Sequence, residues 1–279
     1  MFMDVLKFEF KKLLSRKEFN IVLMVKFILI CVAFIYAVLT LYKFPSSEIP
    51  SAYQLWICQD GVNFVNYLGD IYALFLITLP VCIAYADTYL EDRKEKVFEL
   101  IITRCKKEIY ILCKAICVFL SGFIIVFFPL LLHQILCIIA LPLYSISEAT
   151  NGLPVYRSYF LSTQLYFFNI HVKNPYLHNI LYMFLDGLFG GIVAIFSYSL
   201  SFLKKINRYV VIILPTVLFL TENFVAAVLH KANFSLGYYL SVTTNVVGMN
   251  YNIFSFSLIV LIMISVVIIL TNVCRDDIE

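Results

Sequence analysis

Residues 109–132 read IYILCKAICVFLSGFIIVFFPLLL, an apolar stretch in which Lys114 is the one charged residue. The hydrocarbon core of a bilayer is roughly 30 Å thick, and a helix that rises about 1.5 Å per residue needs about 20 apolar residues to cross it. Backbone N–H and C=O groups find no water there, so a crossing segment must satisfy them within a helix. The stretch therefore predicts a membrane-spanning helix.

Similar apolar segments recur along the whole chain. Hydrophobic residues make up 62% of the sequence and charged residues 14%, whereas a soluble domain has about 25% charged residues. The six predicted spans are 19–42, 68–88, 109–132, 179–202, 209–230 and 252–273. The predicted fold class is an all-α polytopic membrane protein, in which residues 1–279 form a single transmembrane domain.

Basic residues predict the orientation of these spans. Of the 21 Lys and Arg residues, fifteen lie before the first span, in the second and fourth connections or in the tail, and four lie in the other connections. The remaining two, Lys26 and Lys114, lie in the first turns of their spans and are expected to snorkel to the interface. Because short loops rich in Lys and Arg stay inside, both termini are expected in the cytoplasm. The net charge of +3 reflects this topology, and no nucleic-acid partner is expected.

Residues 1–18 predict a helix of their own. Phe2, Leu6, Phe10 and Leu13 recur every three to four residues, while lysines occupy the other faces. This pattern favours an amphipathic helix that lies in the inner interface with its apolar side toward the acyl chains. The alternative is a simple basic anchor for the first span.

Residues 89–108, between the second and third spans, carry the strongest functional signal. A helix there would align Glu91, Glu95 and Glu99 along one side. Its other side would hold the apolar residues Val97, Phe98, Ile101 and Ile102. Such a helix can lie on the membrane and present its charges to a soluble partner. The alternative is a solvated loop with incidental helical character.

The order of these elements resembles the permease subunits of ABC-2-type ATP-dependent exporters. In that family this connection reads as an acidic residue, Glu-Leu-Leu, Thr-Arg, a short basic turn, a Glu–aromatic pair and a Lys that opens the third span. The matching residues are Glu91, Glu99-Leu100-Ile101, Thr103-Arg104, Lys106-Lys107, Glu108, Tyr110 and Lys114. The chain departs from the pattern near Lys96, where the family has Gly, and at Cys105, where Pro often follows Thr-Arg. The resemblance covers most of the chain in layout and this connection in motif.

The resemblance implies a divergent bacterial member in the cytoplasmic membrane, of the kind that exports peptides or bacteriocins or confers self-immunity. Such permeases pair with a second copy or a homologous permease, and they bind cytoplasmic ATPase subunits. It assigns ATPase coupling to Glu91, Glu95, Val97, Phe98, Glu99, Ile102 and Arg104. The sequence has no Gly-x-x-x-x-Gly-Lys-Ser/Thr phosphate-binding loop, so ATP and Mg²⁺ are expected on the partner and no cofactor in this chain.

Two carboxylates lie within predicted spans. Asp186 is two turns inside the outer start of the fourth span, and Glu222 is two turns inside the outer end of the fifth, so both are expected about 12 Å deep on the same side. A carboxylate in a membrane is costly and usually faces a protein interior or a wet cavity. Both residues are therefore predicted to line a translocation pathway. The alternatives are helix capping or packing for Asp186 and a structural role for Glu222.

Further features bear on packing. Gly187 and Gly191 have the spacing that permits close helix approach, with a partner that the sequence does not identify. His133-Gln134 is expected to be an interfacial polar pair. The apolar run 109–142 is too long for one span, so the third helix is expected to project outward or to bend after Pro142. The aromatic residues of the external segment 143–178 predict an interfacial belt, or alternatively the cover of an exit path.

Three functions of different classes remain open from the sequence. The first is the permease of an ATP-driven exporter that moves a peptide or another amphiphile. The second is an ATP-independent channel or carrier, in which inverted repeats would be expected. The third is an intramembrane enzyme, which would need a Glu-Glu pair and inward histidines; the chain has no Glu-Glu pair and only four His. The eight cysteines show no disulfide framework or metal-binding spacing, so no catalytic or metal-ligating residue is predicted.

Overall fold

The computed structural model describes residues 2–42, 49–56, 77–146, 154–155, 167–203, 206–240 and 250–273. Within these ranges, five helices are long and apolar enough to cross a membrane. They are α2 (Lys17–Leu41), α7 (Lys107–Ala140), α9 (Pro175–Leu200), α10 (Arg208–Val228) and α12 (Tyr251–Val273). Each lies where the sequence predicts a span. The structure is thus consistent with an all-α membrane protein.

The predicted second span is described only in its last part. Residues 68–76 lie outside the described ranges, and the chain then forms α4 (Leu79–Val81) and the π-helix η2 (Cys82–Ala86). Pro80 sits in the first turn of α4, where its missing N–H has no helical partner to lose. Pro129 and Pro215 are tolerated inside α7 and α10.

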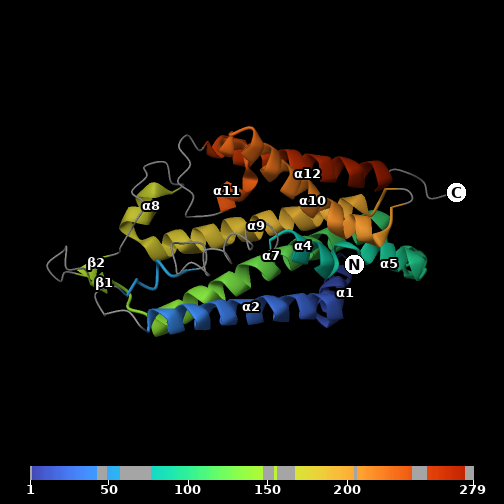
Figure 1. Cartoon of the computed structure of the whole chain (residues 1–279). Coiled ribbons are helices and arrows are strands. Elements are labelled where there is room, and N and C mark those ends of the chain that lie inside the picture. Colours follow the sequence, from blue (N-terminus) through green and yellow to red (C-terminus); the bar gives the residue numbers. More distant parts are fainter. Residues whose placement is uncertain are drawn as a thin grey trace.

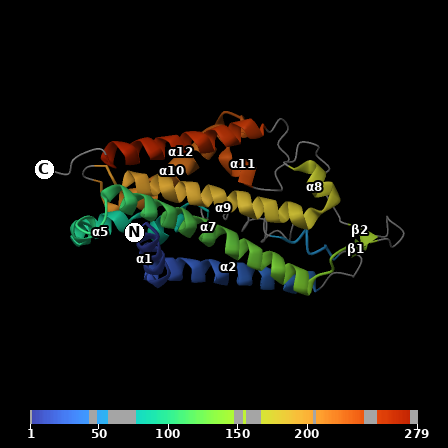
Figure 2. The same ribbon diagram turned by 180° about the vertical axis from the view of Figure 1, so that it is seen from behind.

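The shorter elements gather at the two ends of the long helices (Figure 1). At one end lie α1 (Phe2–Ser15), α5 (Thr88–Lys94) and α6 (Val97–Ile102), and we call it the charged end. At the opposite end lie the two-residue antiparallel strands β1 (Ser145–Ile146) and β2 (Pro154–Val155) and the helix α8 (Phe168–Lys173). Figure 2 shows the same division from behind. The 3-10 turn η4 (Ala232–Phe234) and α11 (Leu236–Leu240) follow α10.

Helices α7 and α9 form the centre of the molecule, and glycines allow them to approach closely. A Cβ placed on Gly122 of α7 would lie 2.6 Å from the carbonyl oxygen of Gly190 on α9. A Cβ on Gly191 would lie 2.6 Å from the ring of Phe119. The close approach predicted from Gly187 and Gly191 therefore has α7 as its partner.

Helix α7 also settles the expectation for the long apolar run that ends at residue 142. It continues as one helix to Ala140, eight residues past the predicted end of the span at 132, and so projects beyond the length needed for a bilayer. The described part of segment 143–178, which was predicted to be external, contains β1, β2, α8 and the first turn of α9. Of its aromatic residues, Tyr144 is exposed and the Tyr176 hydroxyl donates to the Leu143 carbonyl oxygen at 2.8 Å. Tyr156, Tyr159, Phe160 and Tyr166 lie outside the described residues.

The outer helices leave large apolar side chains exposed. Helix α12 buries only Phe254 and Ser265, while residues such as Ile259 and Val267 are more than half exposed. An apolar surface of this extent is costly in water and suits contact with lipid.

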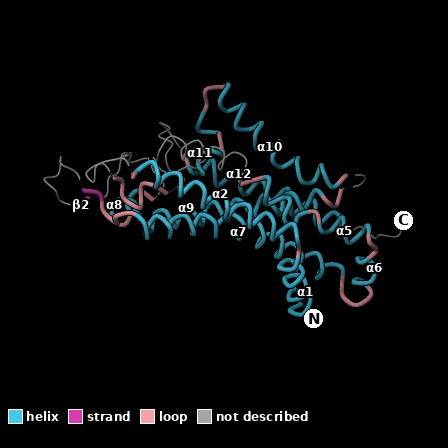
Figure 3. The backbone as a smooth tube through the Cα atoms, turned by 60° about the horizontal axis from the view of Figure 1, so that its bottom comes forward, coloured by secondary structure: helices cyan, strands magenta, loops and turns pink. Residues whose placement is uncertain are grey.

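Helix α1 forms within the predicted residues 1–18, and its placement in a membrane interface stays a prediction. It runs across the direction of α7 (Figure 3) and buries Glu9 and Leu13 against the rest of the chain. Phe2 and Phe10 are exposed instead, so the expected apolar face of residues 1–18 is divided between the protein core and the surface. The burial of Glu9 has a specific cause, which lies in the polar contacts of the charged end.

Candidate functional site

Two arginines at the charged end bind the same set of carboxylates. The Arg16 guanidinium lies 2.9 Å from Asp87 and 3.0 Å from Glu91. The Arg208 guanidinium pairs with Asp87 and lies 3.1 Å from Glu91. Both arginines also contact Glu18, at 3.2 and 3.4 Å. These contacts tie together the elbow between α1 and α2, the end of the second predicted span, α5 and the start of α10.

A second cluster surrounds Asp92 of α5. Its carboxylate accepts hydrogen bonds from Lys12 of α1, at 2.5 Å, and from Tyr110 and Lys114 of α7. Burial alone would raise the pKa of Asp92, but Lys114, Lys12 and the Tyr110 hydroxyl hold it below its usual value. Asp92 is therefore a buried carboxylate that is kept ionised by its neighbours.

Glu9 belongs to this second cluster. The Tyr85 hydroxyl of η2 donates to the Glu9 carboxylate at 2.8 Å, and the Lys114 ammonium lies 4.0 Å from it. We call the two clusters together the ion-pair network; its members are Glu9, Lys12, Arg16, Glu18, Tyr85, Asp87, Glu91, Asp92, Tyr110, Lys114 and Arg208. Because its members come from six elements, the network fixes the charged end as one unit.

The network corrects the predictions for the two lysines near the span starts. Lys114 is fully buried and paired with Asp92, and Lys26 is 2% exposed within α2. Neither snorkels to an interface. The charge of Lys26 acts instead on Asp186 of α9, which is also fully buried. Asp186 does not cap a late-starting helix, because α9 begins at Pro175 and its N-cap is Asn174.

The connection 89–108 is not one continuous helix. Helix α5 ends at Lys94, and Lys96 adopts a left-handed conformation (φ 58°, ψ 14°) before α6 begins at Val97. The predicted alignment of Glu91, Glu95 and Glu99 along one helix is therefore wrong. The left-handed residue stands where the resembled family has glycine, the residue that adopts this conformation without steric cost.

The predicted coupling residues divide into two groups. Glu91 belongs to the ion-pair network, and Phe98 is buried between the rings of Tyr89 and Tyr110. Burial raises the pKa of Glu91, with Arg16 and Arg208 acting against it. The second group faces outward: Glu95, Glu99, Ile102 and Arg104 are exposed, and Val97 is half-buried. The exposed members of this second group are the ones most accessible to another protein.

A groove lies beside the exposed residues of α6, between α6 and α1. It has a volume of about 690 Å³ and combines apolar with charged side chains. Its lining consists of Asp4, Val5, Phe8, Leu100, Ile101, Thr103, Arg104, Cys105 and Tyr110. The charged end thus offers a recess next to the outward-facing part of the connection.

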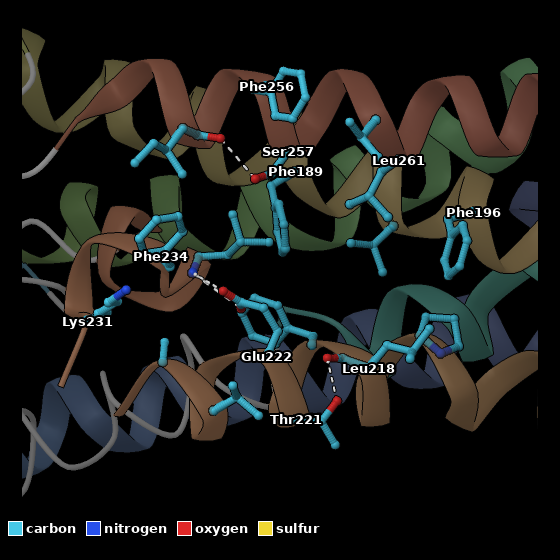
Figure 4. Close-up of a pocket in the computed structure, with 18 of the residues that line it drawn as sticks. Phe189, Phe196, Leu218, Thr221, Glu222, Lys231, Phe234, Phe256, Ser257 and Leu261 are labelled. Carbon is cyan, nitrogen blue, oxygen red and sulfur yellow. Dashed lines mark hydrogen bonds between the residues drawn. The ribbon is translucent and has the colours of Figure 1, made fainter. Parts of the chain in front are cut away.

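A separate apolar pocket contains Glu222. It lies between α9, α10, α12 and the segment from η4 to α11, with a volume of about 750 Å³. Figure 4 places Glu222 near its middle, with Lys231 and Phe234 at one end and Leu261 and Phe196 toward the other. We call it the Glu222 pocket.

Glu222 also holds the start of α11. Both of its carboxylate oxygens accept from the Leu236 N–H, at 3.2 and 3.3 Å. The neighbouring Asn223 accepts from the Gly237 N–H at 2.9 Å and from the Ser235 hydroxyl. The polar pair 222–223 therefore fixes the turn that closes one side of the pocket.

The structure does not bring Asp186 and Glu222 into one polar lining. Glu222 faces the pocket and α11, whereas Asp186 is fully buried, interacts with Lys26 of α2 and does not line the pocket. The prediction that the two carboxylates share one pathway is therefore wrong for this conformation. Equal depth on two helices does not fix the direction in which each side chain points.

Neutral polar groups fill the opposite end. The Asn179 amide donates to the Gln134 side-chain oxygen at 2.7 Å, and the Gln134 amide donates to the Ala52 carbonyl oxygen at 3.1 Å. The Tyr53 hydroxyl and the His171 Nδ1 atom lie 2.9 Å apart. His133 and Gln134 are both buried, so the predicted interfacial pair is a core pair instead.

Searches among protein families, curated proteins and solved structures find no match to this chain. The functional interpretation of the charged end and of the Glu222 pocket therefore depends on their geometry alone. Within the described ranges, no group of three or more His, Cys, Asp or Glu side chains could hold a metal ion.

Most of the ion-pair network was not predicted from the sequence. Glu9 and Asp87 were assigned no role, Asp92 was expected to pair with Lys96 four residues on, and Arg208 was counted only toward the topology. Asp87 and Arg208 each stand directly at the end of an apolar segment. Their position could have indicated an ion-pair site, because a charged residue at the end of a span lies near the charged residues at the ends of neighbouring spans. The pairing itself depends on which helices are neighbours.

Proposed function

We propose that this chain is the membrane subunit of an ATP-driven exporter of the ABC-2 type, which moves a peptide or another amphiphile and takes its ATPase from another polypeptide. The observation that carries the proposal is the ion-pair network. It fastens α5 to α1, α7, α10 and the elbow before α2, through Lys12, Lys114, Arg208 and Arg16. A displacement of the exposed connection would therefore reach several long helices at once.

The outward-facing residues of the connection support an ATPase contact. Glu95, Glu99 and Arg104 are exposed, and Leu100 is 69% exposed beside the α1–α6 groove. An exposed leucine among charges is a common feature of protein interfaces, where an apolar contact has a polar rim. Glu91 would act from within, by holding the connection to Arg16 and Arg208.

The proposed orientation places the charged end in the cytoplasm of a bacterial cell, in agreement with the distribution of Lys and Arg. Cysteines introduced singly at Lys94 and at Lys173, which are exposed at opposite ends, test it. A membrane-impermeant thiol reagent should label position 173 in intact cells and position 94 only after permeabilisation. Labelling of position 94 in intact cells would refute this orientation.

The ATPase contact is tested by charge reversal. The full-length chain, tagged and co-expressed with an ABC ATPase encoded beside it, should retain that ATPase in detergent. Glu95→Lys combined with Glu99→Lys should abolish retention while the protein still inserts, because exposed charges contribute little to folding. Lys173→Glu at the opposite end is the matched control and should retain the ATPase. Retention by the double variant at the control level would rule out this contact.

A further inference from the structure

The Glu222 pocket lies among helices that are suited to contact lipid. Its walls are α9, α10 and α12, three helices apolar enough to cross a bilayer. Of its lining residues, Val225, Leu229 and Phe256 are 51%, 60% and 67% exposed. A molecule that enters from the membrane must be largely apolar, since it passes through lipid. The volume of about 750 Å³ lies within the range of about 300–1,000 Å³ that is typical of small-molecule sites.

The lining contains a carboxylate that the described part of the chain does not neutralise. Glu222 is half-buried, and its hydrogen-bond donor there is the backbone N–H of Leu236, which both oxygens share. A carboxylate has about four acceptor positions, so most of its capacity is unused. Lys231, the other ionisable residue of the lining, is exposed and forms no ion pair with Glu222. Within the pocket, the Glu222 carboxyl group lacks a basic partner.

The rest of the lining indicates the shape of the ligand. On the α10 side, the wall toward the charged end consists of Leu218 and Pro215, and Phe196 and Leu261 face them from α9 and α12. Pro215 precedes Glu222 by two helical turns, about 10 Å along α10. A narrow aliphatic chain fits such a wall, and it would run from Glu222 toward the middle of the helices.

We propose that the Glu222 pocket binds a single-chain amphiphile with a protonated amine, whose amine pairs with the Glu222 carboxylate and whose aliphatic chain lies along Leu218, Phe196 and Leu261. The positive head pairs with the Glu222 carboxylate inside the pocket, and the tail replaces lipid against apolar side chains. This inference concerns binding alone, so it stands or falls independently of an ATPase partner.

The probe for the test is a long-chain primary alkylamine that carries a diazirine on its tail. The full-length chain in phosphatidylcholine nanodiscs is irradiated with this probe, and the labelled peptides are identified by mass spectrometry. The alcohol and the fatty acid of the same length, with the same diazirine, serve as matched probes. The amine should label α10 and α12 peptides around the pocket, and the fatty acid should label them least, because its charge repels that of Glu222.

Two variants separate the charge from the shape of the site. Glu222→Gln keeps an acceptor for the Leu236 N–H but removes the charge, and should lower amine labelling about tenfold or more, as expected for the loss of a charged hydrogen bond. Val260→Trp fills the pocket without changing Glu222 and should lower labelling by all three probes. Val266→Trp, on α12 but outside the lining, is the control and should label as the unmodified chain does.

The outcomes are distinct. Equal labelling by the amine and the fatty acid, or unchanged amine labelling of Glu222→Gln, would overturn the proposal. If Glu222→Gln does not fold, the comparison of probes and the Val260→Trp variant still decide it. Lysophosphatidylethanolamine, a single-chain lipid with an amine head group, distinguishes the natural source of the amine when it is added to the nanodiscs. Competition indicates a lipid head group, and no competition indicates another single-chain amine.

Discussion

The ion-pair network and the Glu222 pocket both place carboxylates beside apolar helices, but they differ in the groups that pair with those carboxylates. In the network, Asp92 is 2% exposed and receives donors from two lysines and a tyrosine. In the pocket, Glu222 has one backbone N–H from Leu236 and an open apolar volume beside it. The first region is closed by its own side chains, and the second is left open.

This difference indicates a structural role for the network and a binding role for the pocket. Removing one partner of a buried ion pair is strongly destabilising, because it leaves a charge without compensation. A complete network therefore fixes the positions of its helices, which suits the transmission of movement. An incomplete site makes little contribution to folding and has capacity left for a ligand. The same kind of substitution, a carboxylate replaced by its amide, should thus lower stability more in the network than in the pocket.

The largest effect is expected at Asp92. Asp92→Asn keeps the shape of the side chain but leaves Lys114 and Lys12 with one negative partner fewer, so it should lower stability by about 3–5 kcal/mol. Thermal unfolding in detergent measures this loss. Glu99→Gln, an exposed residue of the same connection, should change stability by no more than about 0.5 kcal/mol. Equal unfolding midpoints for the two variants would show that Asp92 is not buried in a network.

The next effect concerns the close packing beside the network. Gly122→Ala would bring a methyl group within 2.6 Å of the Gly190 carbonyl oxygen, and backbone cannot rotate away. The helices α7 and α9 must then separate, at a cost of about 1–3 kcal/mol. Gly187→Ala meets the edge of the Phe123 ring at 2.8 Å and should cost less, because a side chain can move. The same unfolding assay ranks the two, and the reverse order would contradict the packing.

A smaller effect on stability is expected in the open region. Glu222→Gln retains the hydrogen bond from the Leu236 N–H and should keep wild-type abundance. If the chain exports a cargo as proposed, this variant should export less of it. Glu222→Leu loses that bond and should cost about 0.5–2 kcal/mol, the value of a helix cap, so abundance and export both fall. Immunoblots of membranes give abundance, and cargo outside the cell gives export. Normal export by both variants would assign Glu222 a structural role.

The smallest effect is a gain of stability at Lys96. Its left-handed conformation costs a residue with a Cβ about 1–2 kcal/mol, which Lys96→Gly removes at the expense of a more flexible unfolded chain. We expect a net gain of about 0.5–1 kcal/mol. Lys94→Gly, inside α5, should instead lose about 0.5–1 kcal/mol. A loss at both positions would mean that the connection adopts one continuous helix after all.

The predictions from the sequence were most successful where a rule acts on one segment at a time. The apolar lengths identified the regions of all five described spanning helices, because the thickness of a bilayer fixes the length of helix it requires. The same reasoning explained why α7 runs past its span, and the Gly187–Gly191 spacing correctly indicated close packing. ATPase coupling by Glu95 and Glu99 stays a prediction, since the structure shows only that both are exposed.

Predictions failed where the direction of a side chain depends on its neighbours. Asp186 and Glu222 were expected at matching depths in one pathway, yet Asp186 is fully buried away from the pocket and Glu222 binds the start of α11. Lys114 was expected at an interface and is buried, because Asp92, 22 residues away in sequence, lies beside it. The pairing of Glu91 with Arg16 and Arg208 was likewise not predicted, and its role in ATPase coupling stays a prediction.

The sequence by itself determined the class of this protein, the approximate position of its apolar helices and the separation of basic from apolar segments. Those properties follow from composition and periodicity, because the free energy of transferring a segment into lipid depends on the residues of that segment alone. Only the tertiary structure decided which charges are paired and which is left open. The reason is that a buried charge is stabilised by atoms within a few ångströms, and those atoms come from helices that the chain brings together only on folding.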